Sequence, residues 1–113
     1  MIQVKIDYKN MSQSDALNEV INENIEKLEK IFDRITTCHV VVSLPHRSHV
    51  HGKVFHVHID LHIPGNNIVI TREPEKDDSH DDVYFAVREA FKVAKRKLQT
   101  HVDKMRDDVK KHL

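Results

Sequence analysis

The sequence predicts an α+β fold: a two-layer sandwich with the order β-α-β-β-β-α, whose four-stranded sheet carries both helices on one face. Segments of alternating apolar and polar residues, typical of half-buried strands, are interrupted by two segments in which apolar residues recur every three or four positions. Two amphipathic helices need an apolar surface to cover, and one face of the sheet supplies it. Because 113 residues are too few for two separate cores, we expect residues 1–113 to form one domain.

The N-terminal part predicts a strand, a helix and a second strand. Residues 2–7 (IQVKID) alternate between apolar and polar, as a half-buried strand does. Ser12 or Ser14 can cap the helix that follows. The apolar stripe of this helix consists of Leu17, Ile21, Ile25, Leu28 and Phe32. The β-branched run at 38–44 (CHVVVSL) predicts a short strand that Pro45 ends.

The C-terminal part predicts a hairpin and a long helix. From Phe55 to Ile63 apolar residues alternate strictly with histidines and one aspartate, which predicts a strand with one buried face. Pro64-Gly65-Asn66 makes a turn, and residues 68–70 return as the hairpin partner. From Val83 the period becomes helical, with an apolar stripe formed by Tyr84, Val87, Phe91, Ala94, Leu98, Val102, Met105 and Val109. The polar segments 45–53 and 72–82 are expected to be loops.

Charge is distributed unevenly along the chain. Eighteen basic and eighteen acidic residues cancel over the whole sequence. From Val83 to the end there are nine basic and four acidic residues, which leaves nine basic and fourteen acidic residues in 1–82. Such asymmetry within one small domain favours a basic surface that faces an anionic partner. The alternative is a long helix that is rich in lysine and arginine because its outer side is solvated.

In the first helix, Lys27, Lys30 and Arg34 are predicted to form a basic stripe well away from the apolar stripe. In the final helix, Arg88, Lys92 and Lys95 lie beside the apolar stripe. We predict that seven basic residues contact RNA: Lys27, Lys30, Arg34, Arg88, Lys92, Lys95 and Arg96. Lysine and arginine bind phosphates, and each neutralised phosphate releases a counterion. Aromatic residues are scarce, so recognition should use the backbone and shape of a folded RNA rather than base stacking. The alternative is a solvated surface on which Glu26 and Glu29 pair with neighbouring lysines.

Several short segments, in this order and spacing, are similar to those of a known family. They are Lys27-Leu28-Glu29-Lys30, Phe32-Asp33-Arg34-Ile35, the run His39 to Leu44, Asp82-Val83-Tyr84 and Lys95-Arg96-Lys97-Leu98. Through them the chain resembles the bacterial ribosome-hibernation family: short hibernation promoting factors, ribosome-associated inhibitors or protein Y, and sigma-54 modulation proteins. The resemblance covers nearly the whole chain and agrees with the predicted β-α-β-β-β-α order.

The resemblance implies a single ribosome-associated domain that sits on the small ribosomal subunit, in the channel used by messenger and transfer RNA. Such a protein blocks translation and protects idle ribosomes without chemistry. The family contacts ribosomal RNA through basic residues on its two helices; by position these are Lys27, Lys30, Arg88, Lys92, Lys95 and Arg96. We therefore expect a cytoplasmic protein that is monomeric and has no cofactor, no small-molecule substrate and no membrane partner.

The histidines suggest a second class of function. His56, His58 and His62 share one face of the predicted strand with Asp60, and imidazoles two residues apart can reach one metal ion. Zinc, nickel or copper would suit such ligands. The alternatives are a polar sheet face exposed to solvent, and an RNA contact that strengthens as the histidines become protonated.

The remaining candidates are an acidic loop and a single cysteine. Asp77, Asp78, Asp81 and Asp82 do not have the spacing of a calcium-binding loop and are expected to favour the start of the following helix. The same loop offers an alternative function, a protein-interaction adaptor that engages a basic partner. Cys38 is expected to be inert packing in a reducing compartment. No catalytic motif or glycine-rich phosphate loop is present, so no enzyme is predicted.

Overall fold

A computed structural model describes residues 2–45, 54–72 and 82–111 of the chain. The elements are β1 (Gln3–Lys9), α1 (Asp15–Ile31), β2 (Thr37–Ser43), β3 (His56–Ile63), β4 (Asn66–Arg72) and α2 (Val83–Lys111). The predicted order β-α-β-β-β-α is confirmed. Most of the two predicted loops, including Asp77, Asp78 and Asp81, lies outside the described residues.

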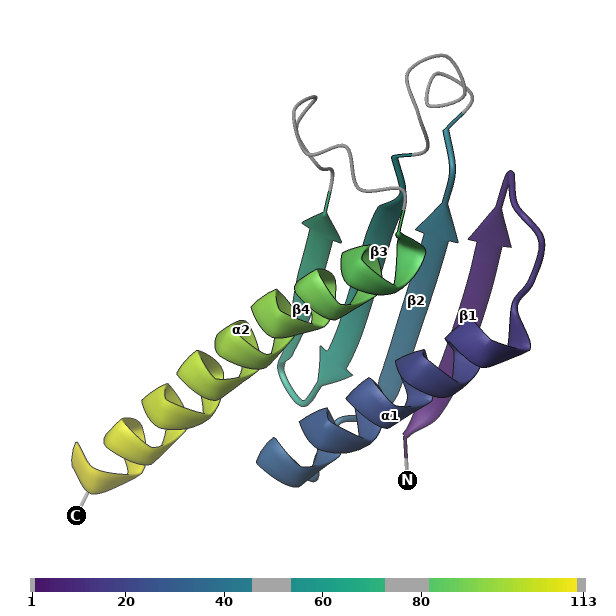
Figure 1. The fold of residues 1–113 in the computed structure, drawn as a ribbon. Helices are drawn as coiled ribbons and strands as arrows, with labels where there is room; N and C mark the ends of the chain where they lie inside the picture. Colours follow the sequence, from purple (N-terminus) through teal and green to yellow (C-terminus); the bar gives the residue numbers. More distant parts are fainter. Residues whose placement is uncertain (1, 46–53, 73–81, 112–113) are drawn as a thin grey trace.

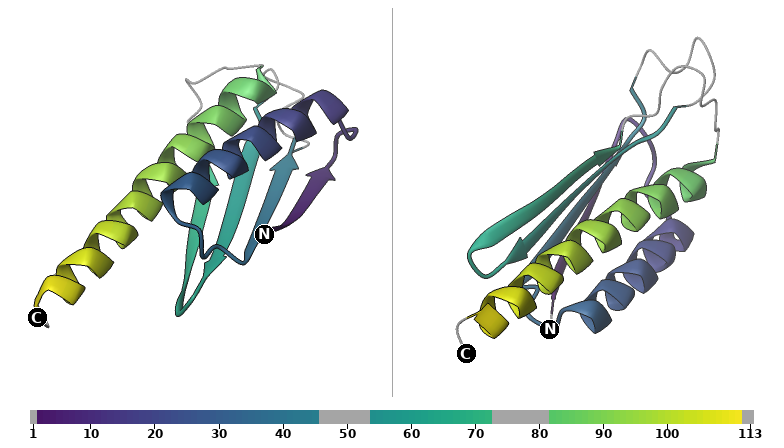
Figure 2. Two further views of the ribbon diagram at one scale, coloured as in Figure 1. Left: turned by 90° about the horizontal axis from the view of Figure 1, so that it is seen from below. Right: turned by 90° about the vertical axis from the view of Figure 1, so that its left-hand side faces the viewer.

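The sheet has the strand order β1-β2-β3-β4 (Figure 1). β1 and β2 are parallel, and α1 forms the crossover between them. β2, β3 and β4 are successively antiparallel, and their register aligns Val40, Ile59 and Ile70 across the sheet. Because side chains alternate between the faces of a strand, this register places the buried apolar residues of these strands on one face, while Val41 and Val69 lie on the other. Both helices cover that face, as the side view in Figure 2 shows, so the predicted two-layer sandwich is confirmed.

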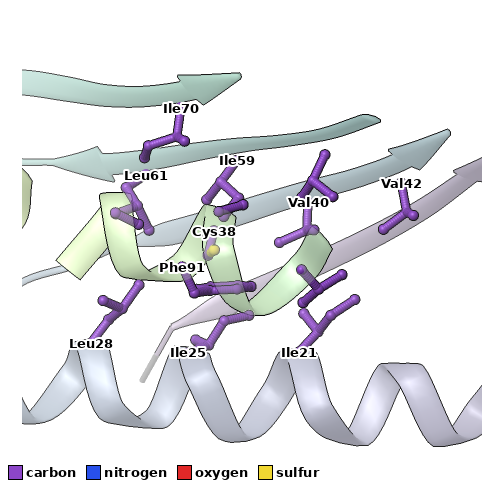
Figure 3. Packing of buried hydrophobic residues seen from close by; sticks show 14 of the residues in the cluster. Ile21, Ile25, Leu28, Cys38, Val40, Val42, Ile59, Leu61, Ile70 and Phe91 are labelled. Carbon is purple, nitrogen blue, oxygen red and sulfur yellow. The ribbon is translucent and has the colours of Figure 1, made fainter. Parts of the chain in front are cut away.

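The core lies between the helices and the covered face of the sheet (Figure 3). The predicted stripe residues that are buried are Leu17, Ile21, Ile25 and Leu28 of α1 and Val87, Phe91, Ala94, Leu98 and Val102 of α2. Tyr84 and Met105 are half-buried, and the side chain of Val109 is not among those described. Val4 is 41% exposed, which differs from the expected half-buried strand, because β1 is an edge strand of the sheet.

The two ends of α1 are set by different interactions. Ser14 is the N-cap, and its hydroxyl accepts a hydrogen bond from the Leu17 N–H at 3.2 Å, which selects it over Ser12. Phe32 was expected in the helical stripe, but it is the C-cap and has an extended backbone. Its ring makes an edge contact with His101 of α2, with the ring centroids 6.1 Å apart. Arg34 therefore lies in the turn before β2, and the prediction that it continues the helix is wrong.

α2 begins at a capped N-terminus and runs past the sheet. The Asp82 carboxylate accepts a hydrogen bond from the Tyr84 N–H at 2.9 Å, so this aspartate stabilises the helix start as expected. At about 1.5 Å per residue, 29 residues give a helix about 43 Å long. Figure 1 and Figure 2 show its C-terminal half extending beyond the edge of the sheet at β4. This half therefore presents side chains that no strand covers.

Cys38 is fully buried on β2, and its burial should make the thiol unreactive. Desolvation and, secondarily, the nearby Asp60 raise the pKa of the thiol to about 12. Only the thiolate is nucleophilic, and at pH 8 it is almost absent. We expect an aromatic disulfide reagent to react with the native protein at least about 100-fold more slowly than with the protein in urea.

The reaction of the urea-unfolded chain provides the control, because it exposes the same single thiol. Rapid, stoichiometric modification of the native protein at pH 8 would contradict the buried position of Cys38.

Candidate nucleic-acid interface

The two flanks of α2 face different neighbours. The Lys97 ammonium donates a hydrogen bond to the Val69 carbonyl of β4 at 3.3 Å, so the Lys97 flank of the helix faces the edge of the sheet. Arg88 and Lys95 lie on the other side of the buried stripe, at the helical spacing of 100° per residue. These side chains therefore lie on the flank that faces α1.

The corresponding flank of α1 carries basic residues too. Its opposite flank faces β1, because Glu29 accepts a hydrogen bond from the Ile2 N–H and Asn18 accepts one from the Tyr8 hydroxyl at 2.7 Å. Lys27 lies across the buried stripe from Glu29, on the side of α2, and Lys30 points outward, away from the buried stripe. The helices lie side by side and run in the same direction (Figure 2). The fold thus brings the basic stripes of two separate segments onto one surface, which we call the helix surface: Lys27, Lys30, Arg88, Lys92, Lys95 and Arg96.

All seven predicted RNA contacts are exposed, Arg34 in the turn after α1 included. Within residues 2–45, 54–72 and 82–111, Lys92 alone among them forms an ion pair, with Glu89 at 3.4 Å. The Lys92 side chain is still 75% exposed, and an ion pair this solvated contributes little. The alternative was that Glu26 and Glu29 pair with the lysines of α1, but neither glutamate forms an ion pair within the described residues. The positive charge of the helix surface is therefore available to a partner.

An open hollow lies on the outer side of α2. Its volume is about 330 Å³, and it is lined by Lys92, Lys95, Arg96, Gln99 and Thr100. Three of these five side chains are cationic. A hollow of this kind suits a phosphate group, which an arginine grips with two N–H groups and a lysine holds as a point charge.

No aromatic platform accompanies these cations in the described part of the chain. Phe55 and Phe91 are buried, and the other aromatic residues, Tyr8, Phe32, Tyr84 and Phe85, are half-buried. Single-stranded nucleic acids are bound by stacking bases on exposed aromatic rings. The site is therefore suited to the backbone of a folded nucleic acid and not to its bases.

The histidines occupy the other face of the sheet, away from both helices. His56, His58 and His62 alternate along β3 with buried apolar residues. The His58 Nδ1 lies 2.9 Å from the Thr71 hydroxyl, and the His62 Nε2 lies 3.3 Å from the Asp60 carboxylate. Among the residues that the structure describes, no group of three or more histidine, cysteine, aspartate or glutamate side chains is placed to hold a metal ion. The metal site proposed for these three histidines therefore gains no geometric support. The preceding predicted loop carries three more possible imidazole ligands, His46, His49 and His51, which lie outside the described residues.

Two carboxylates take part in this histidine-rich face. The Asp7 carboxylate lies 2.7 Å from the His39 Nε2 and 3.9 Å from the Lys5 ammonium. The hydrogen bond with His39 holds the pKa of Asp7 below its ordinary value, with smaller contributions from Lys5 and Lys9. One Asp60 oxygen is buried without a hydrogen-bond partner in the described structure. Charges on this face are thus largely paired, in contrast to those of the helix surface.

Three basic or imidazole side chains of α2 were not among the predicted RNA contacts. Lys97, His101 and Lys104 lie on the β4 flank of α2, at spacings of four and three residues. That spacing was readable in the sequence as one side of a helix. What was not readable is that the flank overhangs the edge of a sheet, because strand order is not evident from the helix itself.

Comparison with known proteins assigns the chain to a family. The family described as sigma 54 modulation protein / S30EA ribosomal protein matches residues 4–106. The chain belongs to this family. The resemblance found in the sequence is thereby confirmed, and the S30EA match extends from β1 into α2.

Curated S30EA relatives carry the name ribosome hibernation promoting factor. The protein of that name from Azotobacter vinelandii is 28% identical over 103 residues, which are 91% of this chain and 85% of the relative. The Escherichia coli K12 protein of the same name is 28% identical over 105 residues, 93% of this chain and 98% of the relative. The prediction that the chain is not an enzyme agrees with this S30EA membership.

Solved structures share the fold. The N-terminal domain of Thermus thermophilus protein Y superposes with a TM-score of 0.70 at 19% identity, covering 89% of this chain and 99% of that domain. A ribosomal subunit interface protein from Coxiella burnetii gives a TM-score of 0.65 at 20% identity, with coverages of 95% and 99%. Of the helices described here, none has the length and apolar character to cross a membrane.

Proposed function

We propose that this chain is a hibernation factor that binds the small ribosomal subunit and inhibits translation. It docks on ribosomal RNA through the helix surface, with Arg34 contributing from the adjoining turn. The protein works in the cytoplasm as a single-domain monomer of residues 1–113, without cofactor, small-molecule substrate or membrane. Membership of the S30EA family and relatives named for ribosome hibernation support this function.

The observation that carries the proposal is the concentration of exposed, mostly unpaired cations on the outer side of one layer. The helices are held in place by a common core with the sheet, so the spacing of these cations is fixed before binding. A rigid cationic surface loses little conformational entropy when it meets an RNA of matching shape. Phosphates supply the affinity, and the shape of the folded RNA supplies the selectivity.

Inhibition then follows from occupancy and requires no reaction. A protein that holds the RNA of the subunit at the channel for messenger and transfer RNA excludes those ligands as long as it is bound.

Co-sedimentation with purified small subunits over a salt series tests this function. The logarithm of the binding constant should fall linearly with the logarithm of the salt concentration, by roughly 0.7 to 0.9 per phosphate contact. If most of the seven cations engage, the slope should be on the order of −5. The large subunit, assayed in parallel, provides the control.

A slope near zero, or equal binding to both subunits, would contradict docking on small-subunit RNA through this surface.

A further inference from the structure

A cleft separates the overhanging half of α2 from the free edge of β4. Its volume is about 360 Å³, and its lining comes from two elements: Lys97, Thr100, His101 and Lys104 of α2, and Asn66, Asn67, Ile68 and Val69 of β4. None of these eight residues is acidic. Asp103, Asp107 and Asp108 are close to Lys104 in sequence, but none of them lines the cleft.

The donors of the cleft are positioned by the fold. Lys97 is anchored through one hydrogen bond to the Val69 carbonyl, and an ammonium has three N–H groups, so two remain for a ligand. The His101 ring makes an edge-to-face contact with the Phe32 ring, and this contact limits the rotation of the imidazole. Lys104 is exposed and forms no ion pair within the part of the chain that is described. Asn66 and Asn67 bring side-chain amides to the opposite wall.

The side chains that line the cleft suit some classes of ligand better than others. A metal ion finds a single imidazole and no carboxylate there. A peptide strand that extends the sheet would compete with the Lys97 ammonium for the Val69 carbonyl at the strand edge. An anion with several oxygens matches two lysines, an imidazole and two amides, and a phosphate group is such an anion.

Continuity with the helix surface indicates where the phosphate comes from. Thr100 lines this cleft and also the hollow formed by Lys92, Lys95 and Arg96. The two sites therefore adjoin around the outer side of α2, and one folded RNA can reach both.

We propose that the cleft between α2 and β4 binds a backbone phosphate of the same RNA and is a second, separate contact of this protein. The inference rests on the proposed function and extends it from one flank of α2 to both. RNA then contacts the helix from the α1 side and from the β4 side. Contacts on both sides define the orientation of α2 on the RNA and add to the affinity.

The test is the salt dependence of small-subunit binding by a variant in which Lys97 and Lys104 are both changed to glutamine. Glutamine keeps a similar helix propensity and removes the charge. The slope of log binding constant against log salt should become smaller by about 0.7 to 0.9 if the cleft neutralises one phosphate. The matched control changes Lys5→Gln and Lys9→Gln, two exposed lysines on β1 at the far edge of the sheet, with the same change in net charge.

The outcomes separate this inference from the proposed function. If the wild-type protein binds with a steep salt dependence and the cleft variant has the same slope, the cleft contact is overturned and the proposed function still stands. An equal decrease of the slope in the β1 control also overturns the cleft contact, because the change in net charge would then explain the effect. Absence of salt-dependent binding by the wild-type protein removes both proposals.

A photoreactive benzophenone amino acid placed at Asn67 identifies the ligand class directly. We expect an adduct with ribosomal RNA, because Asn67 lines the cleft. An adduct with a ribosomal protein, or no adduct from a variant that still binds the subunit, would overturn the assignment to RNA.

Discussion

Reversing the charges of Lys92, Lys95 and Arg96 to glutamate should abolish binding to small ribosomal subunits, with a loss of about 100-fold or more. The three side chains line one hollow on α2 and are exposed, so their replacement leaves the core untouched. The change removes three phosphate contacts and places three carboxylates where phosphates would lie, which adds repulsion to the lost attraction. Co-sedimentation at fixed, moderate salt measures the effect.

A pair of double variants separates position from net charge. Lys92→Glu with Lys95→Glu, and Lys5→Glu with Lys9→Glu, change the net charge equally, but the second pair lies on β1. We expect the first pair to weaken binding by at least about 10-fold more than the second. Circular dichroism and thermal unfolding should show that all variants are folded. Binding that survives the triple reversal would remove the helix surface from the proposed mechanism.

Replacing Leu98 with alanine should produce the largest loss of stability among conservative changes in α2. Leu98 is fully buried in the layer between α2 and the sheet. Alanine is the best helix former, so the change removes packing and leaves the helix propensity intact. Replacing a buried leucine with alanine leaves a cavity and lowers the free energy of unfolding by about 3 kcal/mol. That is a large share of the roughly 5 to 15 kcal/mol that stabilises a small domain.

Thermal and urea unfolding measure this loss, and we expect the midpoint temperature to fall by roughly 10 to 20 °C. Gln99→Ala is the matched control at the next position of α2, where the side chain is exposed and donates a hydrogen bond to Asp103. Its effect should stay within about 0.5 kcal/mol. A Leu98 variant as stable as the Gln99 variant would contradict the packing described for α2.

The stability of the core and the proposed RNA binding are linked through geometry. Leu98 is buried against the sheet, on the side of α2 opposite the exposed Arg96. Packing of this kind holds α2 beside α1, and the spacing of the exposed cations depends on it. The core therefore sets the shape of the helix surface, although none of its side chains contacts a partner.

Much of the fold was predictable from the sequence because each element is locally consistent. The strict alternation from Phe55 to Ile63 allowed only a strand with one buried face, and the structure has β3 there with that pattern. The spacing of Leu17, Ile21, Ile25 and Leu28 likewise allowed only a helix with one buried side. The prediction was wrong at Phe32 and Arg34, because α1 ends at Ile31 and Phe32 is its C-cap with an extended backbone. The Phe32 ring contacts His101 of α2, a contact that the periodicity of α1 does not reveal.

The sequence by itself determined the order of the elements, the core residues of each and the basic stripe of each helix, because these follow from periodicities of two and 3.6 residues along the chain. Only the tertiary structure decided that the stripes of α1 and α2 share a surface, that His56, His58 and His62 lie on the opposite face, and that Lys97 and Lys104 meet the edge of β4. The physical reason is that periodicity fixes the direction of a side chain relative to its own element. The neighbour that lies in that direction depends on strand order and on how the helices pack across the sheet.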